Sequence, residues 1–203
     1  LHLLSRRQRQ MCIRDRSVVN TQGVAVMAAF TAVNRVDDFA YTPQQNIGHA
    51  MTTFLAQNKG AGHKERMKKG FQTGLLIELV YSIGLFCVIW GLAPQIMTLF
   101  AEDGDAQVVS LGISYLHLIS WMYILPGLTN GVQGFFRGIG DLKVTLYSTF
   151  MNMFGRVVAV FVMIRLLQME FASLAWANMV GWIVMLLFEV PLLVKSMRNG
   201  ECG

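Results

Sequence analysis

Charged side chains are rare in the apolar parts of this sequence, and those that occur there are candidates for chemistry. Four long segments contain only Glu78, Arg156 and Glu189 as charged residues; the segments are 71–100, 108–136, 144–164 and 171–194. An ionisable group inside a bilayer costs about 2.5–3.5 kcal/mol on insertion scales, so it usually belongs to an ion pathway or a pair. We therefore predict ion coupling as a role for all three residues.

Each of these residues also has a purely structural interpretation. Glu189 can pair with Lys195 or extend to the headgroups, as long side chains near span ends do. Arg156 can pair with an acid on a neighbouring helix. His117, in the second segment, can relay protons, but packing is the simpler role for a neutral histidine.

Two adjacent acids, Asp37 and Asp38, follow Arg35 in a more polar part of the chain. An aspartate pair can attract or bind a cation, so both are further candidates for ion coupling. The alternative is the first turn of a helix, where the helix dipole favours acids.

Amide side chains and prolines inside apolar stretches suggest a polar cavity and bends. The cavity or substrate candidates are Gln44, Asn46, Asn130, Gln133, Asn152 and Asn178. Hydrogen bonds between helices are their alternative role. Pro43, Pro126 and Gly127 are hinge candidates because proline bends helices.

Motifs of enzymes and metal sites are absent from the sequence, which has no HExxH, paired CxxC or GxSxG pattern. The three cysteines, Cys12, Cys87 and Cys202, lack the spacing of a disulfide framework. We predict a protein that is not an enzyme, with no cofactor, no metal site and no nucleic-acid partner.

Composition points to a membrane protein. Of the 203 residues, 54% are hydrophobic and only 14% are charged, and the mean hydropathy is +0.45. Soluble chains carry about 25% charged residues. Each charge-poor segment is close to the roughly 20 residues that cross a hydrocarbon core. The prediction is an all-α polytopic protein whose partner is the lipid bilayer.

A fifth span is weaker because polar residues and Pro43 interrupt it. Proline in a membrane helix is tolerated where neighbouring groups satisfy the freed carbonyl. This helix should therefore face protein or a water-filled cavity rather than lipid. The predicted spans are residues 25–57, 71–93, 108–136, 144–166 and 171–194.

The loops alternate in charge. Lysine and arginine are frequent in 58–70, absent from 101–107, and present again in 137–143 and after residue 194. The positive-inside rule places the basic loops and the C-terminus in the cytoplasm. The location expected is the plasma or inner membrane.

Residues 1–16 do not fit this topology, because their five arginines would lie on the wrong side. No apolar core follows them, so they are not a signal peptide. Part of the run looks like translated sequencing adapter, so we expect 1–16 to be foreign and 17–203 to be the native segment; the alternative is a native basic patch.

Two glycine motifs follow predicted spans and can end helices with a left-handed residue. They belong to a set whose order and spacing over about 18–198 resemble the multidrug and toxic compound extrusion (MATE) family. The set is Ala28-Ala29-Phe30-Thr31-Ala32 with Arg35, Pro43, Gln57-Asn58 with Gly60-Ala61-Gly62, Arg137-Gly138 with Gly140-Asp141, and Gly181-Trp182.

The resemblance implies a fold and a function. Five transmembrane helices, plus the end of a sixth, would form most of one six-helix lobe of a twelve-helix transporter, and the N-terminal lobe would be the missing partner. Such proteins export small amphipathic or cationic substrates in exchange for sodium or protons. An acid that couples ions in some members corresponds to Pro126 here, which favours a branch whose essential acid lies in the missing lobe.

Other functions remain open at this stage. A related flippase of lipid-linked saccharides should have more basic residues in its cavity than Arg156. A membrane scaffold has no need of a polar fifth span. The isolated segment is expected to be inactive in transport.

Overall fold

The structure is a computed structural model that describes residues 24–100, 106–166 and 172–198. These ranges contain helices and no strand, which confirms the all-α prediction. In chain order they are α2 (Val24–Gly60), α3 (Lys64–Phe100), α4 (Ala106–Ser120), the 3-10 helix η1 (Trp121–Tyr123), α5 (Ile124–Gly138), α6 (Leu142–Leu166) and α7 (Ala172–Arg198). Segment 1–16 and the end of a sixth helix lie outside the described residues.

Four stretches of the described chain are long and apolar enough to cross a bilayer: Lys64–Leu99, Val108–Gly138, Leu142–Met163 and Ala175–Arg198. They coincide with the four charge-poor segments of the sequence. The second runs through α4, η1 and α5, which together form one span. Large apolar side chains such as Ile77, Val80, Phe154 and Phe161 are exposed on α3 and α6. Apolar surface of this extent suits lipid rather than water.

The predicted fifth span is a single helix, α2, of 37 residues with Pro43 inside it. It is not among the stretches that are apolar enough to cross a bilayer by composition. The helix continues through Pro43, so the proline does not divide it in two. The change of helix type lies elsewhere, at η1, shortly before Pro126.

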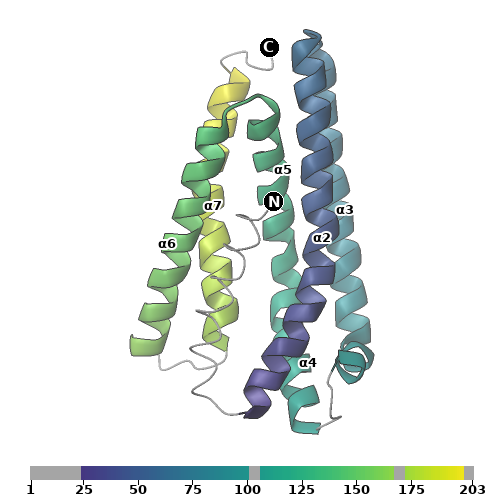
Figure 1. The fold of residues 1–203 in the computed structure, drawn as a ribbon, viewed down its shortest axis with the longest axis vertical. Helices are drawn as coiled ribbons and strands as arrows, with labels where there is room; N and C mark the ends of the chain where they lie inside the picture. Colours follow the sequence, from purple (N-terminus) through teal and green to yellow (C-terminus); the bar gives the residue numbers. More distant parts are fainter. Residues whose placement is uncertain (1–23, 101–105, 167–171, 199–203) are drawn as a thin grey trace, which may run out of the picture.

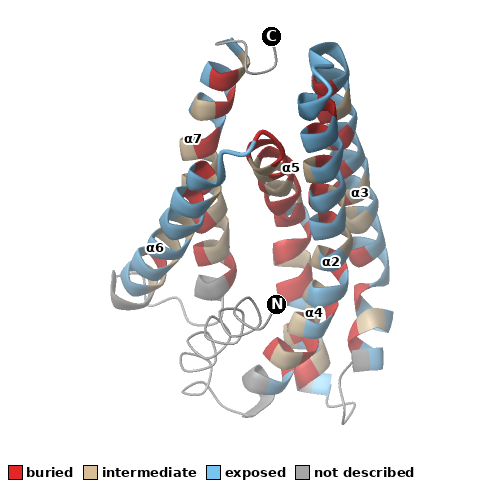
Figure 2. Cartoon of the chain, turned by 45° about the horizontal axis from the view of Figure 1, so that its top comes forward, coloured by how far each residue is buried: buried red, intermediate tan, exposed pale blue. Residues whose placement is uncertain are grey.

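The helices form two groups joined by α5. Helices α2, α3, α4 and α5 pack together, α6 packs against α7, and α5 also contacts both α6 and α7. Figure 1 shows α6 and α7 on one side of α5, and α2 and α3 on the other. Figure 2 shows that α5 is mostly buried, whereas the outer faces of α3 and α6 are exposed.

Glycines allow α5 to approach α2 closely. Gly127, Gly131, Gly134 and Gly138 are all buried on α5, at spacings that keep them on one helix face. A Cβ on Gly134 would lie 2.7 Å from the carbonyl oxygen of Gly48 on α2. Small residues let membrane helices pack backbone to backbone, since apolar side chains gain nothing from leaving lipid.

Both glycine motifs end helices as expected. Gly62 and Gly140 have positive φ angles of 73° and 86°. After Gly62, the amide of His63 donates to the carbonyl of Asn58 at 2.9 Å; the turn at Gly140 repeats this bond from Asp141 to Phe136. The Asn58 side chain bonds the carbonyl of Phe54 one turn earlier, at 2.8 Å.

The two motif turns lie at the same end of the bundle. The Lys59 ammonium of the first donates to the Ile139 carbonyl of the second at 2.5 Å. Figure 1 shows the α2–α3 turn, the α5–α6 turn and the end of α7 at this end. The basic loops therefore group together, as the charge alternation of the sequence requires.

Candidate functional site

A buried polar cluster lies where α2, α3 and η1 meet the start of α5. The Gln44 amide nitrogen donates to the Ser82 hydroxyl and to the Tyr123 carbonyl, both at 3.0 Å. The Ser82 hydroxyl donates to the main-chain carbonyl of Glu78 at 2.7 Å. Gln44 and Glu78 are fully buried, and Ser82 is 1% exposed. We call Gln44, Glu78, Ser82 and the Tyr123 carbonyl the Glu78 cluster.

The carboxyl group of Glu78 points into this cluster. A Cβ built on Gly127 would lie 2.8 Å from Ser82 Oγ, 3.2 Å from Gln44 Nε2 and 3.4 Å from Glu78 Oε2. Three polar side chains therefore converge on Gly127, an α5 position that has no side chain. Among the described residues, neither Glu78 carboxyl oxygen has a hydrogen-bond partner, and Gln44 Oε1 also lacks one.

Asp37 lies next to the cluster and is held by Tyr123. The Tyr123 hydroxyl donates to the Asp37 carboxylate, while the carbonyl of the same residue accepts from Gln44. The Tyr123 ring also packs edge-on against Tyr41, with centroids 5.4 Å apart, and Tyr41 contacts Trp182 on α7. Asp38 is exposed, so the two acids of the predicted pair lie in different environments. Both lie well inside α2, which begins at Val24, so the alternative of a first helical turn is wrong.

Glu189 occupies a second buried polar position, between α5, α6 and α7. It is fully buried, its carboxyl lies beside Ser148 and Gln133, and the Arg137 charge is close enough to attract it. Lys195 is exposed, and within the described residues no hydrogen bond reaches the Glu189 oxygens. The expectation that Glu189 pairs with Lys195 or extends to the headgroups is therefore wrong, because the carboxyl points into the helix bundle.

One face of the middle part of α2 is polar and exposed. It carries Asp38, Thr42, Gln45, His49 and Thr53 at helical spacing. Polar side chains of this kind do not suit hydrocarbon, whereas they suit water or another protein surface. The structure thus agrees with the expectation that α2 does not face lipid on this side.

The remaining predicted residues are scattered rather than gathered in one cavity. Asn46 is exposed, and Asn130, Gln133, Asn152 and Asn178 are half-buried. The Arg156 side chain packs across Gly181, where a Cβ would lie 2.4 Å from its Cγ. His117 stacks on Trp90 with centroids 4.4 Å apart, which is the packing role expected of it.

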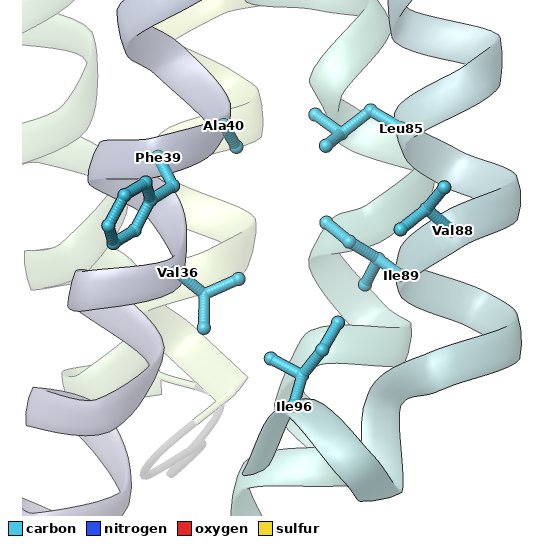
Figure 3. Close-up of a pocket in the computed structure, with 7 residues that line it drawn as sticks. All are labelled: Val36, Phe39, Ala40, Leu85, Val88, Ile89 and Ile96. Carbon is cyan, nitrogen blue, oxygen red and sulfur yellow. The ribbon is translucent and has the colours of Figure 1, made fainter. Parts of the chain in front are cut away.

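Two hollows in the described surface are apolar. Figure 3 shows one between α2 and α3, where the side chains offer only carbon. It is lined by Val36, Phe39, Ala40, Leu85, Val88, Ile89 and Ile96. A second lies along α7 at Ile183, Leu186, Leu187, Val190 and Pro191. Neither offers a polar group that would orient a charged substrate.

Comparison with known families decides the identity of this helical unit. The sequence model of the MatE family matches residues 11–163, which is well over half of the chain. The chain belongs to the MatE family. This MatE chain is accordingly a multi-pass membrane protein.

Individual relatives cover a limited part of their own length. The chain is 26% identical over 138 residues to the probable multidrug resistance protein YoeA of Bacillus subtilis, covering 68% of this chain and 29% of YoeA. It is 29% identical over 130 residues to the probable multidrug resistance protein YpnP of the same organism, covering 64% of this chain and 29% of YpnP.

A solved structure shares the fold of the MatE chain. It is that of a MOP superfamily transporter from Pyrococcus furiosus, which is described as having a binding pocket of reverse polarity. The TM-score is 0.83 with 18% identity, and the match covers 93% of this chain and 41% of the other. The chain thus spans less than half of each of these proteins.

Two members of the Glu78 cluster were missed by sequence reasoning. Ser82 follows Glu78 by one helical turn, a spacing that puts both on one face of α3. The sequence could therefore have predicted Ser82 as a neighbour of Glu78. Tyr123 takes part through its carbonyl as well as its hydroxyl, and a carbonyl contact leaves no signal in the sequence.

Proposed function

We propose that this chain is the C-terminal lobe of a secondary transporter that exports small amphipathic or cationic compounds in exchange for sodium or protons. The observation that carries the proposal is the exposed polar face of α2. Secondary transporters bind substrate between two related lobes. One lobe alone would leave such a face without its partner.

The buried acids add support from an independent direction. Glu78 and Glu189 are both fully buried within membrane-spanning helices. Carboxyl groups are rare at such positions and mark ion pathways in pumps and transporters. A scaffold that only binds other proteins would need neither the polar face of α2 nor these carboxyls.

Efflux of ethidium from cells that express the complete gene product tests the proposal. Cells are loaded with ethidium, and its export is followed by fluorescence with an imposed proton or sodium gradient and again after the gradient is collapsed. We expect export that depends on one gradient. A variant with Val80, a lipid-facing residue of α3, changed to Ala serves as the matched control and should export normally.

Two outcomes contradict the proposal. Ethidium accumulation equal to that of empty-vector cells, with the protein present in the membrane, would exclude export of this compound class. If the genomic locus encodes no further membrane spans upstream of Ser17, the proposal that a second lobe precedes this segment is excluded. The second test also decides whether residues 1–16 are native.

A further inference from the structure

The carboxyl of Glu78 lies deep within the bilayer region. At a rise of about 1.5 Å per residue, Glu78 is about 14 Å along the α3 axis from Lys69, the last charged residue before the apolar stretch, and about 32 Å from Leu99 at the other end of that stretch. Its neighbours in the chain, Ile77 and Leu79, are exposed and apolar. The carboxyl is therefore remote from bulk water on both sides of the membrane.

No positive group of the described chain compensates the carboxyl. The nearest polar side chains, those of Gln44 and Ser82, are neutral and already donate their hydrogen bonds elsewhere. Basic side chains on the two helices packed around it are exposed at the surface; they are Arg35, His49 and Lys59 of α2 and Lys64, Arg66, Lys68 and Lys69 of α3. The other titratable side chains on the surrounding elements are acids or neutral tyrosines, and include Asp37, Asp38 and Tyr41 of α2, Glu65 and Tyr81 of α3, Tyr123 of η1 and Tyr115 of α4. On α5, Arg137 is at the far end of the helix, and His117 of α4 stacks on Trp90.

An isolated carboxylate is expensive in such a place. Burying a charge without a partner costs far more than burying a neutral group. The Glu78 carboxylate must therefore bind a cation or a proton while it is buried in the cluster. A sodium ion requires several free oxygen ligands, whereas the Glu78 cluster offers few oxygens without a partner, namely the carboxyl itself and Gln44 Oε1. A proton requires only one oxygen atom to bind to, and the Glu78 carboxyl supplies it.

We propose that Glu78 binds the coupling proton of this transporter, an inference that rests on the proposed function. In the uptake step, the Glu78 carboxylate takes a proton from water on one side of the membrane and an O–H bond forms. In the release step this bond breaks and the proton leaves to water on the other side. No electrons are transferred.

The surroundings of Glu78 suit a role in conformational change. Pro43 immediately precedes Gln44, and Pro126 immediately precedes Gly127. Pro43 removes one main-chain hydrogen bond from the interior of α2, and Pro126 lies in the first turn of α5, where the 3-10 helix η1 passes into the α-helix. Helix α2 is thus weakened at the level of the carboxyl and α5 begins there, so the protonation of Glu78 can bias how the two helices bend.

Proton-driven uptake of ethidium into liposomes tests this assignment. The complete gene product and its Glu78→Gln variant are reconstituted, and a proton gradient is imposed without sodium. The neutral amide keeps the shape of the carboxyl but binds no proton. We expect gradient-driven accumulation to fall at least about tenfold, a loss of one decade in the coupling equilibrium. Ethidium affinity should stay within about threefold.

Control variants separate this effect from general damage. Glu65 is an exposed acid in the first turn of the same helix, and Glu65→Gln should transport as the unmodified protein does. Equal proton-driven accumulation of ethidium by Glu78→Gln and the unmodified protein would overturn the assignment of Glu78, and would leave the proposed function intact. Transport by the unmodified protein that follows a sodium gradient and ignores a proton gradient would also overturn it, and would leave the proposed function intact.

A conservative variant keeps the test decisive if Glu78→Gln does not fold. Glu78→Asp retains a carboxyl but withdraws it by one methylene, so the proton-binding equilibrium changes. We expect transport whose pH midpoint is displaced from that of the unmodified protein. An unchanged midpoint would overturn the assignment. Absence of ethidium transport by the unmodified protein under either gradient would instead contradict the proposed function.

Discussion

Tyr123 joins two polar groups that would otherwise be poorly satisfied in the membrane. Its hydroxyl donates to Asp37 and its carbonyl accepts from Gln44. The position follows from η1, because a 3-10 turn changes the direction of side chains and carbonyls relative to an α-helix. Interactions of this kind explain why the residue is fully enclosed although it carries a hydroxyl.

Replacing Tyr123 by Phe removes the hydroxyl and keeps the ring contact with Tyr41. We expect a loss of about 1–2 kcal/mol in stability, because the Asp37 carboxyl loses a buried donor. The thermal unfolding midpoint in detergent measures the effect. Tyr81→Phe is the matched control, since its hydroxyl donates to the neutral Ala40 carbonyl at 3.2 Å; a larger loss for Tyr81→Phe would contradict the account.

Glu189 and Arg137 are predicted to depend on each other. The half-buried Arg137 charge attracts the buried Glu189 carboxyl without a hydrogen bond to it, so removal of either charge leaves the other less compensated. We therefore expect Glu189→Ala and Arg137→Ala each to lower stability, and the double variant to lose less than the sum of the two. A double-mutant cycle on the unfolding midpoint gives the coupling, and strict additivity would show that the two residues act independently.

Single residues were predictable where the free-energy cost of placing a charge in an apolar stretch was visible in the sequence. Glu78 was found because an acid in an apolar stretch is expensive wherever it lies. For Glu189, the structural alternative of pairing with Lys195 or reaching the headgroups was wrong, because a position near a helix end fits both a lipid-facing and a protein-facing carboxyl. Only the packing of α7 against α5 and α6 decides between them.

At the scale of elements, the glycine face of α5 sets how closely the central helix can pack. Gly134→Leu places a side chain against the main chain of Gly48. A main-chain carbonyl cannot avoid this contact by changing rotamer, as a side chain could. Overpacking of this kind costs about 1–3 kcal/mol. We expect a lower unfolding midpoint in detergent and a smaller monodisperse fraction.

The control for this substitution lies on α3. Gly84 is exposed, and a Cβ there would meet no atom within 4 Å. Gly84→Leu should leave stability unchanged or raise it slightly, since leucine favours a helix more than glycine does. Equal destabilisation by the two substitutions would mean that the α2–α5 contact has no special role.

The helices themselves follow from composition, and their contacts do not. Apolar length was sufficient to place four spans, and the left-handed glycines were sufficient to place two helix ends. The sequence also contained the glycine spacing of α5, but spacing alone does not say which helix it meets. The course of α2 through Pro43 was predicted as one span over 25–57, and the helix Val24–Gly60 agrees with it, but the sequence did not show which neighbouring groups pack around the proline.

At the scale of the whole molecule, the bundle has two kinds of outer surface. The faces of α3 and α6 carry large apolar side chains, and one face of α2 carries polar ones. A bilayer accounts for the first surface but not for the second. The account of the chain as one lobe of a transporter therefore stands on the polar face of α2.

Cysteine accessibility in the complete gene product tests that claim most directly. In a background without the native thiols, Gln45 and His49 of α2, and Ile77 and Phe154 of the apolar faces, are changed singly to cysteine. The account predicts that a membrane-impermeant thiol reagent modifies the cysteines at 45 and 49, and that ethidium slows this reaction. It predicts no modification at 77 and 154. Equal protection of all four positions would show that α2 faces lipid, and would contradict the account.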